Sequence, residues 1–242
     1  MACERLDKVI AAQGMLSRGD VKKMVWEKRV LINGVYPRTF GDKIDPEKDR
    51  VQIDGREISL KKHVYLMLNK PKGVVSAAND PKEKTVVDLV PPSLLRKGLF
   101  PAGRLDKDTT GFVLITDDGD FAHRILAPKS HVSKTYEALI EGRVTEEMTA
   151  LFERGIPIGK GDVCRPAKLR VIEPGVNDRV EVVITEGMYH QIKRMFEACG
   201  SKVLSLVRTR MGSLALDASL RPGECRELTV EEINKLLGNT NK

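Results

Sequence analysis

The segment DKDTTGFVLITD, residues 106–117, places oxygen ligands at the spacing that opens an EF-hand calcium loop. Asp106, Asp108 and Thr110 stand at alternate positions, and Gly111 follows them where such a loop turns. Three interpretations are open for this segment: a calcium site, a structural turn, or a loop that carries a catalytic carboxylate.

The calcium interpretation fails on the surrounding residues. An EF-hand needs a helix on each side and a bidentate acid, usually glutamate, at its twelfth position. The preceding residues, LFPAGRL, contain proline and glycine, which disfavour a helix. The twelfth residue is the shorter Asp117, and residues 112–116 are typical of a buried strand. Calcium is therefore excluded, whereas a turn remains open because Asp and Thr beside glycine are common in turns.

The composition describes an ordinary folded chain with a basic surface. Its 242 residues allow one or two domains, and 41% hydrophobic with 31% charged residues excludes a disordered protein. The net charge of +7 favours an acidic partner such as nucleic acid or a membrane surface. No apolar run approaches the ~20 residues needed to span a bilayer, and the N-terminus shows no signal-peptide pattern, so we expect a cytoplasmic protein.

Cysteine and histidine spacing gives no support for a metalloprotein. The cysteines form no CxxC pair and the histidines have no metal-ligand spacing. We expect reduced thiols, no metal and no disulfides. The scattered cysteines are Cys3, Cys164, Cys199 and Cys225.

Residues 1–60 are predicted to form a small domain of two helices followed by β-hairpins. Leu6, Val9 and Ile10 share a helix face, and Ser17 is a suitable N-cap for a second helix. The sequences VLINGVY and VQIDGREI each place β-forming residues around a hairpin dipeptide.

Residues 61–242 are predicted to form an α+β domain. Because helices and strands do not alternate regularly, we expect a mixed, mainly antiparallel sheet with flanking helices. Expected strands are Tyr65–Leu68, Phe112–Thr116, Thr135–Ile140, Leu169–Ile172 and Val180–Thr185. Expected helices are Phe121–Leu126, the segment TEEMTALFERG capped by Thr145, Gln191–Cys199 and Thr229–Leu237.

Basic residues gather around the second predicted helix of the first domain. Alone, they describe a solvated helix face, but the sequence RLDKVIAAQGMLSRGDVKKMVWEKRVLINGV resembles the S4 RNA-binding domain. The resemblance implies RNA binding through phosphate contacts. The implied RNA-binding set is Arg5, Ser17, Arg18, Lys22, Lys23, Arg29, Asn33 and Gly34.

The sequence GRLDKDTTGFVLITDDGD resembles the nucleophile motif of pseudouridine synthases, in the RsuA-type branch that carries an N-terminal S4 domain and modifies ribosomal RNA. Three further segments match that branch in order, and the resemblance runs from Arg5 to the last helix. They are LNKPKGVVSA, SKTYEALIEG and EGMYHQIKRMFEACGSKVLSLVRTRMG.

The resemblance implies chemistry that needs no cofactor, because the C1′–N1 bond of a uridine is broken and the base is rejoined through C5. Asp106 is the implied carboxylate, acting as nucleophile or as base at the sugar, and both routes stay open. Asp108 is interpreted as loop structure or helix capping. Arg104 is expected to fill the stack vacated by the flipped base, Tyr136 to pack against that base, and Lys70 to contact RNA backbone.

The cationic partner of Asp106 is expected to be Lys193. The family has a basic residue at the third position of Q-[ILV]-[RK], where sister branches often have arginine, so a lysine departs from the wider pattern. At ~100° per residue, Lys193 lies at the edge of the apolar face of its helix, whereas Arg194 points nearly opposite, toward substrate RNA.

The form YHQIKRM resembles the small-subunit branch most closely, so 16S rRNA is the expected substrate, within a partly assembled small subunit and acted on by a monomer. Two alternatives remain: a 23S rRNA pseudouridine synthase, and a non-catalytic S4-type RNA-binding or ribosome assembly factor.

Overall fold

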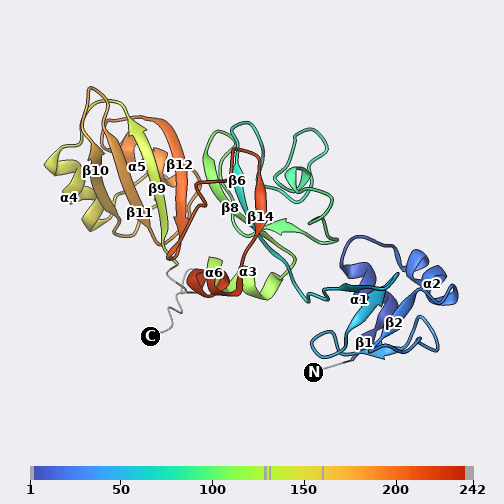
Figure 1. The fold of residues 1–242 in the computed structure, drawn as a ribbon. Coiled ribbons are helices and arrows are strands. Elements are labelled where there is room, and N and C mark those ends of the chain that lie inside the picture. Colours follow the sequence, from blue (N-terminus) through green and yellow to red (C-terminus); the bar gives the residue numbers. More distant parts are fainter. Residues whose placement is uncertain (1–2, 128–129, 131, 160, 238–242) are drawn as a thin grey trace. The chain divides into compact units, whose positions relative to one another are not determined.

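The computed structural model describes residues 3–127, 130, 132–159 and 161–237, which fold as two compact units. The first unit comprises Met1–Val64 and Val90–Leu99, and the second comprises Tyr65–Leu89 and Phe100–Lys242. The sequence prediction divided the chain after residue 60 and did not anticipate that residues 90–99 join the first unit. Figure 1 shows each unit with most of its helices and strands labelled.

The first unit contains the two expected helices, packed on short strands around one apolar core. The helices are α1 (Leu6–Ala12) and α2 (Arg18–Trp26). The strands are β1 (Glu4–Arg5), β2 (Val30–Ile32), β3 (Lys43–Ile44), β4 (Val51–Ile53) and β5 (Arg56–Ile58). The core consists of Leu6, Val9, Ile10, Val21, Val30, Ile44 and Val51.

Both expected hairpin turns form, but only one has two full arms. β4 and β5 pair around Asp54 and Gly55, whose positive φ values of 52° and 75° fit the tight turn. Around Asn33 and Gly34 the amide and carbonyl of Ile32 exchange hydrogen bonds of 2.8 and 2.9 Å with those of Val35, which closes a two-residue turn. The second arm ends at this single bridge, and β2 pairs with β4 along its other edge.

The second unit is built on a mixed sheet in the order β10-β11-β9-β12-β8-β6-β14, with β13 beside β12 and β7 beside β8. β12 and β8 run parallel, and every other pair in this sheet is antiparallel. This confirms the mixed, mainly antiparallel sheet. Its strands are β6 (Tyr65–Lys70), β7 (Phe100–Pro101), β8 (Thr110–Thr116), β9 (Lys134–Ile140), β10 (Lys168–Glu173), β11 (Arg179–Ile184), β12 (Val203–Met211), β13 (Leu214–Ala215) and β14 (Cys225–Glu227).

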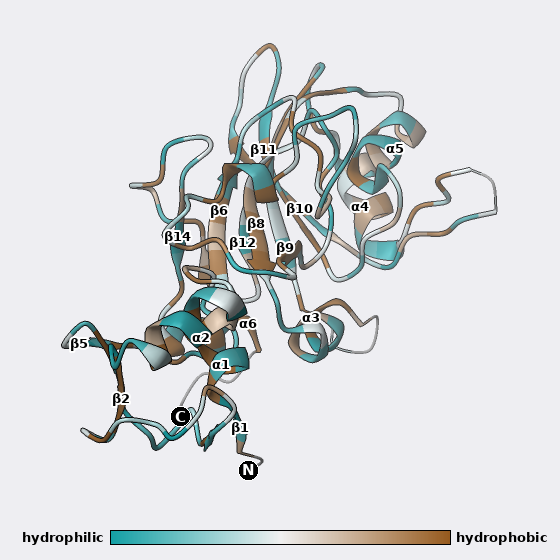
Figure 2. Cartoon of the chain, turned by 90° about the vertical axis from the view of Figure 1, so that its right-hand side faces the viewer, coloured by the Kyte–Doolittle hydropathy of each residue, from teal (hydrophilic) through white to brown (hydrophobic). Residues whose placement is uncertain are grey.

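Helices from distant parts of the chain cover this sheet. α3 (Gly119–Leu126) and α6 (Val230–Leu236) share a core cluster with Phe112 and Leu114 of β8 (Figure 1). α4 (Glu146–Arg154) and α5 (Gln191–Ala198) meet where the rings of Phe152 and Phe196 lie 5.0 Å apart. A short 3-10 helix spans Val87–Leu89. Hydrophobic colouring is concentrated on the central strands in Figure 2, consistent with the burial of most residues of β6 and β8.

The parallel pairing of β12 with β8 depends on a glycine. Gly111 has a φ of +95°, and a Cβ there would lie 2.3 Å from the carbonyl oxygen of Arg208. Any side chain would therefore push the two strands apart. β12 itself was absent from the sequence prediction, although it lies between β9 and β8 in the sheet.

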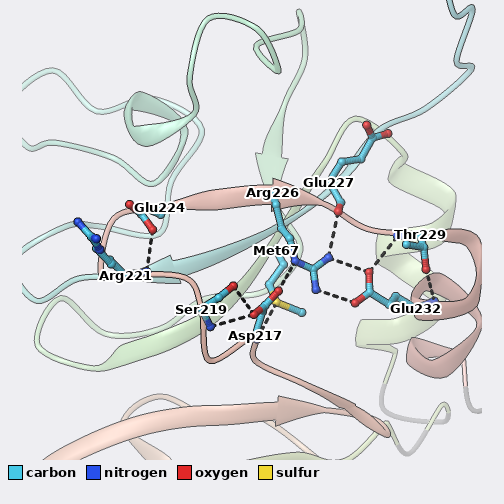
Figure 3. A network of polar contacts seen from close by, with 9 residues as sticks. All are labelled: Met67, Asp217, Ser219, Arg221, Glu224, Arg226, Glu227, Thr229 and Glu232. Carbon is cyan, nitrogen blue, oxygen red and sulfur yellow. Dashed lines mark hydrogen bonds and ion pairs between the residues drawn. The ribbon is translucent and has the colours of Figure 1, made fainter.

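A charged network fixes the C-terminal segment against β6. Arg226 of β14 donates to Asp217 and to Glu232, which also caps the first turn of α6 (Figure 3). Hydrogen bonds from Ser219, followed by the pairing with Arg226, lower the pKa of Asp217 to about 2. The network therefore stays ionised at neutral pH and joins β14 to α6.

Candidate active site

An open cleft of about 1220 Å³ lies within the second unit. Its wall includes the loop before β8, the face of β9 and β12, and the start of α5. Of the residues expected to act on substrate, Arg104, Asp106, Tyr136 and Lys193 line it, whereas Arg194 and Lys70 do not.

Lys193 contacts the expected catalytic carboxylate. Its Nζ lies 3.2 Å from Oδ2 of Asp106 and 2.6 Å from Oδ1 of Asp108, so one ammonium bridges two carboxylates. Asp106 keeps 27% of its side chain exposed, which leaves it open to the cleft. The helix periodicity that favoured Lys193 over Arg194 for this contact agrees with the structure.

The charges of this cluster reinforce one another. The hydrogen bond from Lys193 holds the pKa of Asp108 below its usual value, although burial acts in the opposite direction. Burial alone would lower the pKa of Lys193, but its bonds to Asp108 and Asp106 outweigh that effect and raise it. Both groups are therefore charged at neutral pH. The interpretation of Asp108 as loop structure missed its shorter contact with Lys193.

Sequence reasoning also missed His190 as a neighbour of Asp106. Its Nε2 lies 3.5 Å from Oδ1 of Asp106, and its ring stacks on Tyr189 with centroids 3.8 Å apart. His190 precedes α5 in the left-handed conformation, with φ 49°, which turns its ring toward the cleft wall. The pair YH before the glutamine was a usable signal, but it was interpreted only as a mark of the branch.

Tyr136 and Arg104 occupy different parts of the cleft. Tyr136 lies on β9, is only 7% exposed, and forms part of the sheet face beneath the cleft. Arg104 is exposed on the loop two residues before Asp106 and makes no hydrogen bond or ion pair with any residue that the structure describes. Its guanidinium is thus available to a ligand.

Lys70 does not contact solvent, contrary to its expected role at the RNA backbone. It is completely buried, and its Nζ donates to the carbonyl oxygens of Pro71, Lys107 and Thr109 at 3.1, 3.2 and 2.8 Å. Burial lowers its pKa to about 8, against the opposing attraction of Asp108 and Asp106. Lys70 therefore secures the loop that carries Asp106 from beneath.

Arg194 is likewise a structural residue in this arrangement. Its guanidinium donates to the carbonyl oxygens of Ile158, Gly159 and Tyr189 and pairs with Asp162 at 2.9 Å. Its side chain is 17% exposed. The expectation that it points to RNA was wrong, because Ile158, Gly159 and Asp162 hold its guanidinium on that side of α5.

Several of the expected RNA-binding residues of the first unit make internal contacts. Arg5 and Arg18 both pair with the buried Asp7. The hydrogen bond from Arg5 outweighs the opposing effect of burial, so the pKa of Asp7 is lowered to about 2. Arg29 pairs with Asp54 and Glu27. These arginines remain partly exposed, at 40–58% of their side chains.

The polar members of the same set shape the backbone. Ser17 forms a capping box with Asp20 at the start of α2. Asn33 bonds Asp49 and the amide of Arg50, and Gly34 completes the turn with a φ of 81°. Lys22 and Lys23 are the freer cations: Lys22 lies 5.1 Å from the Phe40 ring, and Lys23 lies 3.8 Å from Glu27.

Within residues 3–127, 130, 132–159 and 161–237, no three or more His, Cys, Asp or Glu side chains are grouped so that they could hold a metal ion. No described helix has the length and apolar character needed to cross a membrane.

Comparison with known proteins places this cleft in a family context. The model of the family described as RNA pseudouridylate synthase matches residues 64–198, more than half of the chain. The sequence is 44% identical over 233 residues to the uncharacterized RNA pseudouridine synthase YtzG of Bacillus subtilis, covering 96% of this chain and 98% of that protein. It is 43% identical over 231 residues to ribosomal small subunit pseudouridine synthase A of Escherichia coli (strain K12), covering 95% and 98%. A crystal structure of a pseudouridylate synthase matches with a TM-score of 0.67 and 39% identity, covering 96% of this chain and 99% of that one.

Replacing neighbouring cations on α5 should separate two roles. Lys193→Met removes the charge that orients Asp106, so the single-turnover rate on RNA should fall by at least ~10²-fold with little loss of stability. Arg194→Met removes the bonds to Ile158, Gly159 and Asp162, so it should lower the free energy of unfolding by about 2 kcal/mol and leave the rate of the folded enzyme nearly intact. Rapid-quench kinetics and urea unfolding measure the two effects. The reverse pattern would refute the assignment.

The buried ammonium of Lys70 should leave a mark on the pH dependence of stability. Below pH 8 it is protonated in both the folded and unfolded states, so folding includes the full cost of burying the charge. Between pH 8 and about 10.4 the unfolded chain holds this proton more tightly, so the contribution of Lys70 to stability should rise with pH. Urea unfolding at pH 7 and 9.5 should show wild type gaining stability relative to Lys70→Met. If the free energy of unfolding changed equally with pH in wild type and Lys70→Met, Lys70 would not have the lowered pKa assigned to it.

Proposed function

Since the chain belongs to the RNA pseudouridylate synthase family, we propose that it converts a specific uridine of 16S rRNA to pseudouridine, with Asp106 as the catalytic carboxylate. The observation that carries this proposal is the position of Asp106, open to the cleft and held 3.2 Å from Lys193. A carboxylate fixed beside a cation is held in one direction, as either route at the sugar requires.

The reaction is an isomerisation within one nucleotide. The C1′–N1 bond breaks, the base turns, C5 bonds to C1′, and C5 loses its proton. Asp106 either bonds to C1′ as the base departs or removes a proton from the sugar. In both routes Lys193 balances and orients the carboxylate, and the nearby His190 helps to orient it.

A uridine in folded RNA reaches such a cleft only when it is flipped out of its stack. Arg104 is proposed to enter the vacated stack, since it is exposed, unpaired among the described residues, and two positions from Asp106. Tyr136 is proposed to pack against the flipped base, since it forms the floor of the cleft.

The choice of small-subunit RNA rests on the relatives. The Escherichia coli protein is named for the ribosomal small subunit, and its match extends across 95% of this chain. We propose a partly assembled small subunit in the cytoplasm as the natural substrate and a monomer as the active form. A 23S rRNA substrate and a non-catalytic assembly role are the alternatives that the experiment below separates.

The first unit is proposed to be an S4-type RNA-binding domain, and residues 61–242 the catalytic domain. Two observations support this: the match to the Bacillus subtilis protein covers 96% of the chain, beyond the second unit, and the first unit has two helices with exposed cations beside short strands. Its affinity would come from phosphate contacts.

Asp106→Asn should abolish pseudouridine formation while keeping fold and RNA affinity, because the amide keeps the shape and removes the charge. The assay incubates protein with unmodified 16S and 23S rRNA, free and partly protein-bound, and maps pseudouridine. The matched control is Asp120→Asn, a change at an exposed carboxylate in the first turn of α3, which should retain full activity.

Each outcome of that assay decides between the functions. A single new site in 16S rRNA supports the proposal, and a site in 23S rRNA supports the large-subunit alternative. If the wild-type protein bound RNA but formed no new pseudouridine, the result would support the non-catalytic assembly role. Activity retained by Asp106→Asn would overturn the role of the carboxylate.

Lys22→Gln with Lys23→Gln should weaken rRNA binding and reduce the slope of log affinity against log salt by about 1.5, as expected for two lost phosphate contacts. The control pair, Lys168→Gln with Lys202→Gln, makes the same change of charge at exposed positions of the second unit. Binding measured across a salt series should leave the control slope unchanged. If the two double variants had the same salt slope, the first unit would have no special part in RNA binding.

A further inference from the structure

Two buried cations lie beneath the cleft without a carboxylate partner. Arg208 of β12 is 1% exposed and Lys134 of β9 is 8% exposed, and both line the cleft. No ion pair joins either of them to an acidic side chain in the part of the chain that the structure describes. The activity proposed above assigns no role to them.

The sheet register brings these cations to the side of the cleft where the base is expected. Arg208 is the direct partner of Tyr136 across the β9–β12 pair, so their side chains project from the same face. Lys134 lies two residues before Tyr136 on β9 and shares that face. A base packed on Tyr136 would therefore have both charges close beneath it.

Their hydrogen bonds leave donors unused. Arg208 donates from Nε to the carbonyl of Phe112 at 2.7 Å, but its Nη2 is buried with no partner. The hydroxyl of Thr109, also in the cleft wall, is buried and unpartnered as well. Among the described residues, Lys134 donates a hydrogen bond only to the carbonyl of Val132, at 3.2 Å. Burial, followed by the charge of Arg208, lowers the pKa of Lys134, against the attraction of Glu186, which makes no ion pair with it.

Such an arrangement is costly for the empty protein. A buried cation with no counter-charge loses its hydration, and its neighbour adds repulsion. An anionic ligand would offset both costs, because it would pair with the unused donors. The required ligand is therefore an anion, or a group that becomes one, at the base end of the cleft.

The proposed reaction generates that anion. When the C1′–N1 bond breaks, its electron pair stays with the uracil, whose negative charge spreads over N1 and the two carbonyl oxygens. In one route Asp106 forms the compensating bond to C1′. In the other, Asp106 takes the C2′ proton and a C1′–C2′ double bond forms. Atoms and electrons balance in both routes, and both routes leave an anionic base beside Tyr136.

We propose that Arg208, with Lys134 beside it, stabilises the uracil anion released during base transfer. This inference rests on the proposed function and names the groups that act on the departing base, as Asp106 acts on the sugar. Stabilisation aimed at charge that develops only in the transition state raises the rate and leaves ground-state binding unchanged. A phosphate of the bound RNA is charged before the reaction, so binding of a phosphate by Arg208 would instead raise affinity.

The test compares three variants of the full chain: Arg208→Met, Lys134→Met and the control Arg210→Met, an exposed arginine on the same strand. At saturating enzyme, Arg208→Met should lose at least ~10²-fold in single-turnover rate, and Lys134→Met at least ~10-fold. The RNA affinity of both should match that of Arg210→Met, which should keep the wild-type rate. If Arg208→Met does not fold, Lys134→Met and Arg208→Lys carry the test, the latter retaining part of the rate because it retains the charge.

A substrate with a less basic leaving base gives an independent readout. RNA carrying 5-fluorouridine at the target site releases a more stable anion, so cleavage of its original N-linked base should depend less on Arg208. The rate ratio between wild type and Arg208→Met should shrink on this RNA. An unchanged ratio, or a loss confined to affinity, would overturn the inference, and the latter would point to a phosphate. If wild type forms no pseudouridine in any RNA, the proposed function itself fails.

Discussion

The active-site loop depends on one buried ammonium. Lys70 has three N–H donors and meets three backbone carbonyls, two of them in the loop that follows Asp106. A lysine so placed cannot be hydrated, so its charge is tolerable only while these carbonyls stay in position. The loop is thereby held to the end of β6. This fixed loop backbone lets Asp106 and Asp108 face Lys193, although both side chains are partly exposed.

The charge balance around this loop suits a negatively charged substrate. Lys70 lies beneath it, Lys193 lies against its carboxylates, and Arg208 and Lys134 lie under the cleft floor. Two carboxylates, Asp106 and Asp108, are the acidic groups paired in the cluster. These cations therefore outnumber the carboxylates paired with them, although Glu186 also attracts Lys134. A negatively charged substrate such as RNA fits this balance.

The sequence was informative where a residue's role depends on local pattern. The strands β6, β8 and β9 followed from runs of β-branched and apolar residues, and the Lys193 contact followed from the helix period. The sequence was uninformative where the role of a residue depends on partners that are distant in the chain. Nothing local distinguishes the buried Lys70 from a solvated lysine, and Asp162, the partner of Arg194, lies 32 residues away. β12 was missed because its arginines interrupt the apolar run, and one of them, Arg208, is buried for reasons that only the sheet register reveals.

The lysine at position 193 fits this site better than an arginine would. Its ammonium is a compact charge, and it approaches Asp106 at 3.2 Å and Asp108 at 2.6 Å together. A planar guanidinium favours two parallel bonds to a single carboxylate, so it would leave one of the two acids without its partner. Lysine at this position and aspartate at position 108 are therefore physically linked.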